Sequence, residues 1–412
     1  MPPAVLGVGP LASGMEPDLS ALDAFLDDAG VDGFLVDAAS DDSDQLYLSG
    51  FDAPDPFHTL YDGEVHLLVS SLEYGRAKTE SHAASVERHA DYDLRQRVED
   101  YGRLDGTRRV LAEFLTRRDV DSVAVPARFP LATADGLRER GIDVRTPESP
   151  PIGRGGGNVV EDIRATKTDA EIEHVRTAQN ANEAAMAAAE RLLSEAAVED
   201  GRLVHDGEVL TSEAVKEEIE VTLLREGCAL DETIVACGAD AADPHDRGSG
   251  PLEPDEAIIV DIFPRDKATK YHADMTRTFV VGAPSPEIRE WYDLTAEAKA
   301  AALDAVEPGA TGADVHDAVC DVYEDAGEPT LRADESVEAG FIHNTGHGVG
   351  LDVHEQPLVG PGGDELEPGH VITIEPGLYD PEIGGIRIED IIVVTEGGYE
   401  NLTDYPERLV VE

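Results

Sequence analysis

Single acidic residues inside apolar, strand-forming segments constrain this chain more than any other feature of its sequence. The segment 257–263 is typical of a β-strand rich in β-branched residues, yet it contains Asp261. A carboxylate is costly to bury unless it has a partner or a metal ion. A second such segment, 271–281, follows a short polar stretch, and the two predict a β-hairpin. Pairing symmetric about the polar stretch would place Asp261 opposite Asp274, with Cβ atoms about 4.5–5.5 Å apart. Two carboxylates at that distance need cations between them.

The same arrangement recurs near the C-terminus. Two apolar, β-branched segments flank the turn at 380–385, and they carry Glu375 and Glu389. These two residues are symmetric about Glu382, so an uninterrupted register would make them cross-strand neighbours. Pro376 and the glycine after it are expected to distort the end of the first strand.

A histidine completes the candidate metal site. His347 lies between two glycines, which we expect to adopt positive φ and to bring the ring close to a ligand. His343 and His354 lie within a few positions of it, and His245 precedes the first acidic strand. Manganese-type metals favour carboxylate oxygens with some imidazole, and two of them roughly 3.5–4 Å apart can activate one water. The sequence therefore predicts a two-metal hydrolase with the ligands Asp261, Asp274, His347, Glu375 and Glu389.

Several short segments follow one another in a recognisable order. They are 234–238 with 244–245, Asp261 with 274–278, 347–355, 374–377 and 385–390. In this order they resemble the pita-bread metallopeptidases, the family of prolidase, aminopeptidase P, methionine aminopeptidase and the metal-free creatinase. The segment 164–172 resembles the family's entry into its catalytic domain, so the similarity covers at least residues 160–412.

The resemblance implies a role for each predicted ligand. Asp261 would hold one metal ion and His347 the other, and Asp274 and Glu389 would bridge the pair. Glu375 would bind metal and handle the proton of the attacking water. The metal ions would stabilise the oxyanion that forms at the scissile carbonyl.

Further residues would surround the substrate. His245 and His354 would hydrogen-bond the substrate or the intermediate, which makes both of them, with Glu375, the candidate catalytic residues. Arg387 would either pair with a substrate carboxylate through its planar guanidinium or form a salt bridge to one of the acids, and both possibilities stay open. His343 would lie near the metal ions or shape the substrate pocket.

Two positions depart from the family pattern. Phe263 stands where the family commonly has a small residue, which affects the shape of the pocket and not the coordination of metal. Ile391 stands where relatives often have threonine, which puts one hydrogen bond behind the ligands in doubt.

The first third of the chain predicts an α/β layer. Strands are expected at 33–36, 64–69 and 122–125, and helices at 19–29 and 105–117. With the segment 46–51, this region resembles the creatinase/prolidase-type N-terminal domain, which in relatives shapes the substrate opening and takes part in dimer formation. The stretch 147–158, rich in Pro and Gly, predicts a boundary between an N-terminal domain at 1–155 and a catalytic domain at 156–412.

Composition and charge restrict the setting. With 412 residues and 41% hydrophobic content, the chain is long enough for two domains with cores of their own. The formal net charge is −55, and the acidic residues are spread along the whole length. Such a surface suits concentrated salt, which screens its self-repulsion. This predicts a halophilic source, and it makes nucleic acid and anionic membranes poor partners.

The cysteines and the apolar segments indicate the compartment. Cys228, Cys237 and Cys320 form neither a disulfide framework nor a metal-binding spacing, which fits a reducing cytoplasm. The apolar segment 2–14 is short and lacks a basic region, and no later segment reaches about 18 consecutive apolar residues. Neither export nor membrane anchoring is expected.

These observations predict a two-domain α/β enzyme, a metal-dependent Xaa-Pro peptidase of the prolidase type. Its expected partners are small peptides and a second copy of the chain. Two divalent ions per subunit are expected, Mn²⁺ or Co²⁺ first, with Zn²⁺ or Fe²⁺ as alternatives. The competing predictions are an aminopeptidase P that acts on longer peptides and a hydrolase of a compatible solute such as ectoine. A non-catalytic binding protein on the same fold is disfavoured because all five ligand types are present.

Overall fold

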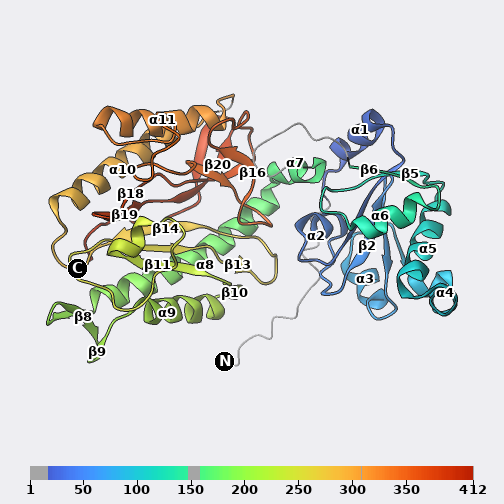
Figure 1. Ribbon diagram of the computed structural model, residues 1–412, viewed down its shortest axis with the longest axis horizontal. Helices are drawn as coiled ribbons and strands as arrows, with labels where there is room; N and C mark the ends of the chain where they lie inside the picture. The colour runs from blue at the N-terminus through green and yellow to red at the C-terminus, as the bar shows by residue number, and fades with distance from the viewer. Residues whose placement is uncertain (1–16, 147–157, 308, 412) are drawn as a thin grey trace. The chain divides into compact units, whose positions relative to one another are not determined.

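The computed structural model describes residues 17–146, 158–307 and 309–411. The chain divides into two compact units, Met1–Arg164 and Ala165–Glu412, and each is described by itself (Figure 1). The predicted domain boundary at 155/156 and the apolar segment 2–14 lie outside the described residues. Among the helices in the described ranges, none combines the length and the apolar character needed to cross a membrane.

The first unit is built on a six-stranded mixed sheet in the order β4-β3-β2-β1-β5-β6. Strand β1 pairs antiparallel with β2 and parallel with β5. Leu60 and Leu68 of the sheet belong to one buried core with Leu111 and Phe114 of α5. The elements are α1 (Ser20–Ala29), β1 (Gly33–Ala38), α2 (Ser43–Ser49), β2 (Phe57–Tyr61), β3 (Val65–Val69), α3 (Tyr74–Glu80), β4 (Ser85–Arg88), η1 (His89–Tyr92), α4 (Leu94–Tyr101), α5 (Arg103–Thr116), β5 (Ser122–Ala124), α6 (Leu131–Arg138), β6 (Asp143–Arg145) and α7 (Val159–Ala165).

The second unit has two halves, each with strands packed on a pair of helices. In the first half the sheet β11-β12-β14 packs on α8 and α9, and in the second the sheet β16-β15-β17-β20-β21 packs on α10 and α11. Figure 1 shows the strands of these two sheets between the two helix pairs. The mixed α/β class predicted from the sequence is confirmed.

The elements of the second unit follow in chain order. They are α8 (Asp169–Ser194), β7 (Ala197–Glu199), β8 (Arg202–His205), β9 (Glu208–Val209), α9 (Ser212–Arg225), β10 (Cys228–Ala229), β11 (Thr233–Cys237), η2 (Gly238–Ala242), β12 (Ile258–Ile262), β13 (Arg265–Asp266), β14 (Met275–Phe279), α10 (Pro286–Ala305), α11 (Gly312–Ala326), β15 (Gly346–Gly348), β16 (Glu355–Val359), β17 (Val371–Ile374), β18 (Gly377–Asp380), β19 (Gly384–Arg387), β20 (Asp390–Thr395) and β21 (Gly398–Asn401).

The register of the first acidic hairpin differs from the prediction. Asp261 on β12 faces Thr276 on β14 and does not face Asp274. The pairing is displaced by two residues, and because side chains alternate with a period of two, the displacement leaves Asp274 on the same face of the sheet as Asp261. Asp261 and Asp274 are therefore diagonal neighbours on one face.

The chemistry of the turn explains this displacement. The Asp266 carboxylate accepts hydrogen bonds from the amides of Ala268 and Thr269, at 3.0 and 2.6 Å. Lys270 then adopts a φ of 70°, and Arg265 pairs with His272 across the turn. The turn is therefore centred one residue later than the symmetric hairpin predicted from the apolar pattern.

The ladders on both sides of the second acidic pair have the register predicted for it. Ile374 pairs with Asp390 where β17 meets β20, and Gly377 pairs with Arg387 where β18 meets β19. Both pairs are symmetric about Glu382, as predicted. Strand β17 ends at Ile374, so the expected distortion lies at Pro376 and the residue before it.

Candidate metal centre

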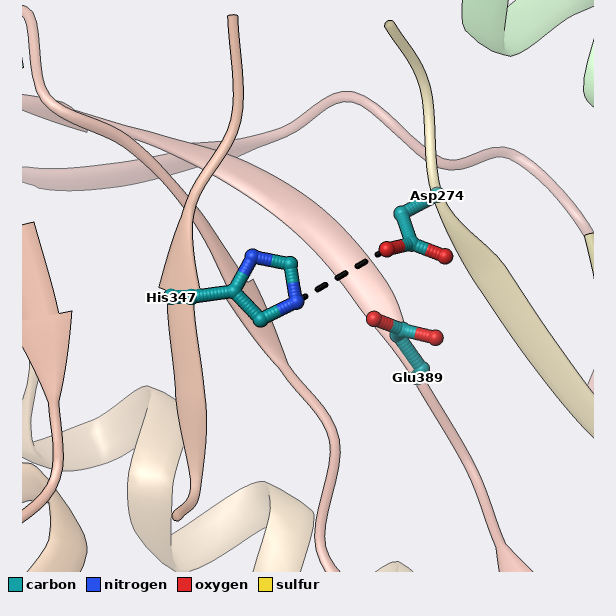
Figure 2. A group of neighbouring side chains, drawn as sticks. All are labelled: Asp274, His347 and Glu389. Carbon is teal, nitrogen blue, oxygen red and sulfur yellow. Dashed lines mark ion pairs between the residues drawn. The ribbon is translucent and has the colours of Figure 1, made fainter. Parts of the chain in front are cut away.

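Three side chains from separate segments of the second unit converge on one point. Asp274 precedes β14, His347 lies in β15, and Glu389 lies between β19 and β20. Each offers one ligand atom, and these atoms lie within 4.8 Å of one another (Figure 2). The His347 Nε2 atom is 3.7 Å from Asp274 Oδ2 and 3.5 Å from Glu375 Oε1. Asp261 interacts electrostatically with the other three carboxylates, so all five predicted ligands gather here.

The glycines beside His347 act by their size and not by their φ angles. A Cβ on Gly346 would lie 2.0 Å from the Thr373 carbonyl oxygen, and one on Gly348 would lie 2.0 Å from the Gln356 carbonyl oxygen. Neither glycine has a positive φ, so that part of the prediction is wrong. The missing side chains instead let β15 pack closely between its neighbouring strands, and this places His347 at the centre.

Burial makes ionisation of these carboxyl groups costly without a cation. Burial, reinforced by the neighbouring carboxylates, raises the pKa values of Asp274 and Glu389 well above their usual range. Burial also raises the pKa of Glu375 to about 8, although the nearby Arg387 opposes this. Burial lowers the pKa of His347 to about 3, which keeps the imidazole neutral and able to bind metal.

Two of the carboxylates each accept a hydrogen bond through one oxygen, and their second oxygen has no hydrogen-bond partner. Arg387 Nη2 donates to Asp261 Oδ2 at 2.7 Å, and the Thr276 hydroxyl donates to Glu389 Oε2 at 2.8 Å. Asp261 Oδ1 and Glu389 Oε1 are buried without a hydrogen-bond partner, as is Asp274 Oδ1. Buried polar atoms normally have partners. An acidic site with such oxygens and one neutral imidazole fits divalent metal ions.

Three further histidines lie around this centre. The His354 ring packs edge to face against His347, with ring centroids 4.2 Å apart. The His343 ring lies with Nε2 3.0 Å from the Tyr379 hydroxyl. His245 is exposed and interacts electrostatically with both His343 and His354. The structure therefore brings the predicted histidines close to one another beside the ligand His347.

Arg387 is almost wholly buried and forms the salt bridge that the sequence left as one of two possibilities. Besides Asp261, its guanidinium donates to the Tyr379 hydroxyl at 2.8 Å and to the Thr276 hydroxyl at 3.2 Å. A contact between Arg387 and a substrate carboxylate stays a prediction. Sequence reasoning missed Thr276 and Tyr379. The alternation of Asp274 and Thr276 along one strand was the signal that could have found the first.

The two departures from the family pattern have structural counterparts. The Arg247 guanidinium lies over the Phe263 ring, 5.7 Å from its centroid, in the segment just after His245. The Ile391 side chain is fully buried, and its amide donates to the Thr403 hydroxyl at 3.0 Å.

Comparison of the sequence with known protein families agrees with the geometry of this site. The profile of the Creatinase/Prolidase N-terminal domain matches residues 19–147, and the profile of Metallopeptidase family M24 matches residues 173–396. The chain belongs to metallopeptidase family M24. This M24 metallopeptidase is 28% identical to the Xaa-Pro dipeptidase of Pyrococcus furiosus, over 96% of its own length and 100% of the relative's.

Solved structures give the same result for the fold of this M24 metallopeptidase. The prolidase from Pyrococcus horikoshii matches it with a TM-score of 0.75 at 26% identity, covering 95% of this chain and 99% of that one. The X-Pro aminopeptidase from Thermotoga maritima matches with a TM-score of 0.72 at 25% identity, covering 93% of this chain and 98% of that one. The predicted architecture, a creatinase-like domain followed by a pita-bread catalytic domain, is confirmed.

Proposed function

We propose that this M24 metallopeptidase is an Xaa-Pro dipeptidase of the prolidase type, which hydrolyses the bond before proline in dipeptides. The observation that carries this proposal is the gathering of the predicted ligand residues in a chain that aligns over 96% of its length with a named Xaa-Pro dipeptidase. The alignment includes the N-terminal region. In our proposal this region forms a domain of its own, and the boundary with the catalytic domain lies at 155/156.

In this proposal the site holds two divalent ions. The ligands are Asp261, Asp274, His347, Glu375 and Glu389. Support comes from the three buried oxygens without partners and from the raised pKa values of the carboxyl groups, which a cation would lower again. Four carboxylates with one imidazole favour Mn²⁺ or Co²⁺. Bound ions of this kind lower the pKa of water and polarise a carbonyl.

The protein's own groups then orient the substrate and move protons. Glu375 is proposed to accept the proton of the attacking water and to pass it to the leaving amine, since its carboxyl group lies within the centre. His354 and His245 are proposed to donate hydrogen bonds to the substrate carbonyl as negative charge develops on it. His343 and Arg387, linked through the Tyr379 hydroxyl, are proposed to form the wall of the substrate pocket.

We also propose a halophilic source and a cytoplasmic setting for the enzyme. A net charge of −55 supports the halophilic source and argues against anionic partners. The matched N-terminal domain supports a homodimer, because domains of this type take part in dimer formation in relatives.

Removal of a bridging carboxylate tests the metal assignment. Asp274→Asn and Glu389→Gln keep the side-chain shape but remove a charge, so each variant should lose metal and activity together. Bound metal is measured by atomic emission after gel filtration in molar salt, and turnover is measured on the same sample. Full metal occupancy with wild-type turnover in either variant would remove that residue from the ligand set.

Aminopeptidase P activity is the second candidate, and the likeness to the Thermotoga maritima X-Pro aminopeptidase favours it. The two activities differ in whether residues follow the proline. A preference for Xaa-Pro tripeptides over Xaa-Pro dipeptides, measured as kcat/KM, would favour this second candidate.

A further inference from the structure

A buried ion pair lies directly behind the segment that carries His354. The Lys167 ammonium is 2.5 Å from Oε1 of Glu355, the residue that follows His354. The two side chains are 1% and 4% exposed. Charged groups are rarely buried this completely unless they are paired, and the pair is costly to desolvate. The ion pair therefore fixes the position of the chain at Glu355.

Lys167 is anchored from two sides. Its amide donates to the Gly369 carbonyl at 2.9 Å, and its ammonium also donates to the Ala165 carbonyl at 3.2 Å. The next residue, Thr168, forms a capping box with Glu171 at the start of α8. The backbone of Lys167 is thus fixed between the start of α8 and the segment that leads into β17, and this fixes the point from which the ammonium reaches Glu355.

The Glu355 carboxylate in turn organises the segment 349–354. Its Oε2 atom accepts a hydrogen bond from the Asp352 amide at 3.4 Å. Gly350 packs against it, since a Cβ there would lie 2.1 Å from Oε1. The Gly350 amide donates to the Asp352 carbonyl at 3.0 Å, and the Gly350 carbonyl accepts from the His272 amide at 2.8 Å. The segment therefore wraps around one buried carboxylate.

His354 needs this support because its own side chain is exposed. Its ring packs against His347, and the backbone on either side sets its direction. We infer that Lys167 and Glu355 are positioning residues for His354, and that their ion pair holds the segment 349–354 so that this ring meets the substrate. The inference rests on the proposed catalytic role of His354.

Amide hydrogen exchange tests the structural part of this inference without an activity measurement. Lys167→Met removes the charge at similar length, and Glu355→Gln keeps the shape if the first variant folds poorly. Both should speed exchange in the peptide 349–355 by about tenfold or more, with 371–374 and the metal content unchanged. Unchanged exchange at 349–355 in both variants would overturn the inference.

A matched control separates a local effect from a general loss of stability. Arg118 pairs with Glu87 in the first unit, and its side chain is 14% exposed. Arg118→Met therefore removes a largely buried cation elsewhere in the chain. It should leave exchange at 349–355 and kcat at the wild-type level. A similar acceleration at 349–355 in this control would contradict a specific role for Lys167.

A double-mutant cycle tests the functional part. Lys167→Met should lower kcat by about 10–100-fold on an Xaa-Pro dipeptide, but it should have no further effect in a His354→Ala background. A purely structural contact would lower kcat equally in both backgrounds, and that result would overturn the inference. If the wild-type enzyme cleaves no Xaa-Pro peptide, the proposed function fails, and the exchange measurement still decides whether the ion pair holds the segment.

Discussion

At the scale of single residues, contacts between separate hairpins hold the metal ligands in place. Thr276 and Glu389 are 113 positions apart in the chain, yet the Thr276 hydroxyl donates a hydrogen bond to the Glu389 carboxylate. Arg387 likewise donates to the Asp261 carboxylate at 2.7 Å. The position of each carboxylate therefore depends on how the hairpins pack together.

The raised pKa values predict that metal affinity depends on pH. The pKa of Glu375 in the folded protein is about 8, against 4.5 for an ordinary glutamate, so the group is protonated at pH 7 without metal. Its contribution to the stability of the metal-free protein is therefore present below about pH 4.5 and is lost as the pH rises toward 8. Metal binding must release this proton, and the affinity should rise between pH 6 and 8.

Titration calorimetry with Mn²⁺ in buffers of different ionisation enthalpy measures this proton release. Release should be large at pH 6 and 7 and should fall above pH 8. Glu375→Gln should reduce it. An affinity and a proton release that do not change with pH would contradict the assigned pKa shifts.

His354→Ala separates catalysis from metal binding. The ring packs against His347 but is not among the proposed ligands, so the variant should keep its metal. Its kcat/KM should fall about 10²-fold, because a hydrogen bond to the developing oxyanion is lost. Metal analysis and steady-state kinetics in molar salt check both statements, and an unchanged kcat/KM would exclude the proposed role.

At the scale of strands, the sequence predicts the register of a strand pair correctly where no side chain competes for the backbone hydrogen bonds of the turn. The Glu375–Glu389 register follows from apolar symmetry because the ladders on both sides of it share one centre. The Asp261–Asp274 register does not follow, because the Asp266 side chain accepts backbone hydrogen bonds and moves the turn. The signal was an aspartate at the start of a turn, a residue that often bonds to the backbone of the residues that follow.

The close approach of β15 to β17 predicts a large effect of one methyl group. In Gly346→Ala the Cβ would meet the Thr373 carbonyl oxygen, so β15 must move and carry His347 with it. We expect a loss of about 1–3 kcal/mol in stability and at least about tenfold weaker metal binding. Thermal unfolding and metal titration measure the two effects.

Gly397 provides the matched control for this substitution. It lies between β20 and β21 and has no positive φ, and a Cβ added to it would have no other atom within 4 Å. Gly397→Ala should therefore change stability by less than about 0.5 kcal/mol and leave metal binding as it is. Equal effects at both glycines would contradict the packing argument.

At the scale of the whole molecule, the charge predicts a dependence on salt. With a net charge of −55, self-repulsion should destabilise the folded chain at low ionic strength. The Debye length falls from about 10 Å at 0.1 M salt to about 3 Å at 1 M, so Tm should rise steeply over this range. Thermal unfolding in KCl from 0.1 to 3 M tests this, and a Tm that is independent of salt would argue against the halophilic assignment.

The two-part organisation could be predicted from the sequence because the catalytic motifs all lie in the second unit. Of the first unit, the expected strands and helices are confirmed within two residues at each end, whereas the strands β2, β4 and β6 and the helices α3, α4 and α6 were not predicted. The strand β2, Phe57–Tyr61, illustrates why. This strand is short and fully buried, so it lacks the alternation that marks half-exposed strands.

The most direct test of the proposed function is hydrolysis of an Xaa-Pro dipeptide in high salt by metal-stripped protein, before and after addition of Mn²⁺ or Co²⁺. An Xaa-Pro tripeptide and ectoine serve as comparison substrates. We predict that the stripped protein is inactive, and that added metal restores cleavage with the highest kcat/KM on the dipeptide. Cleavage of ectoine alone, or no turnover of any substrate by protein that has rebound two metal ions, would contradict the account.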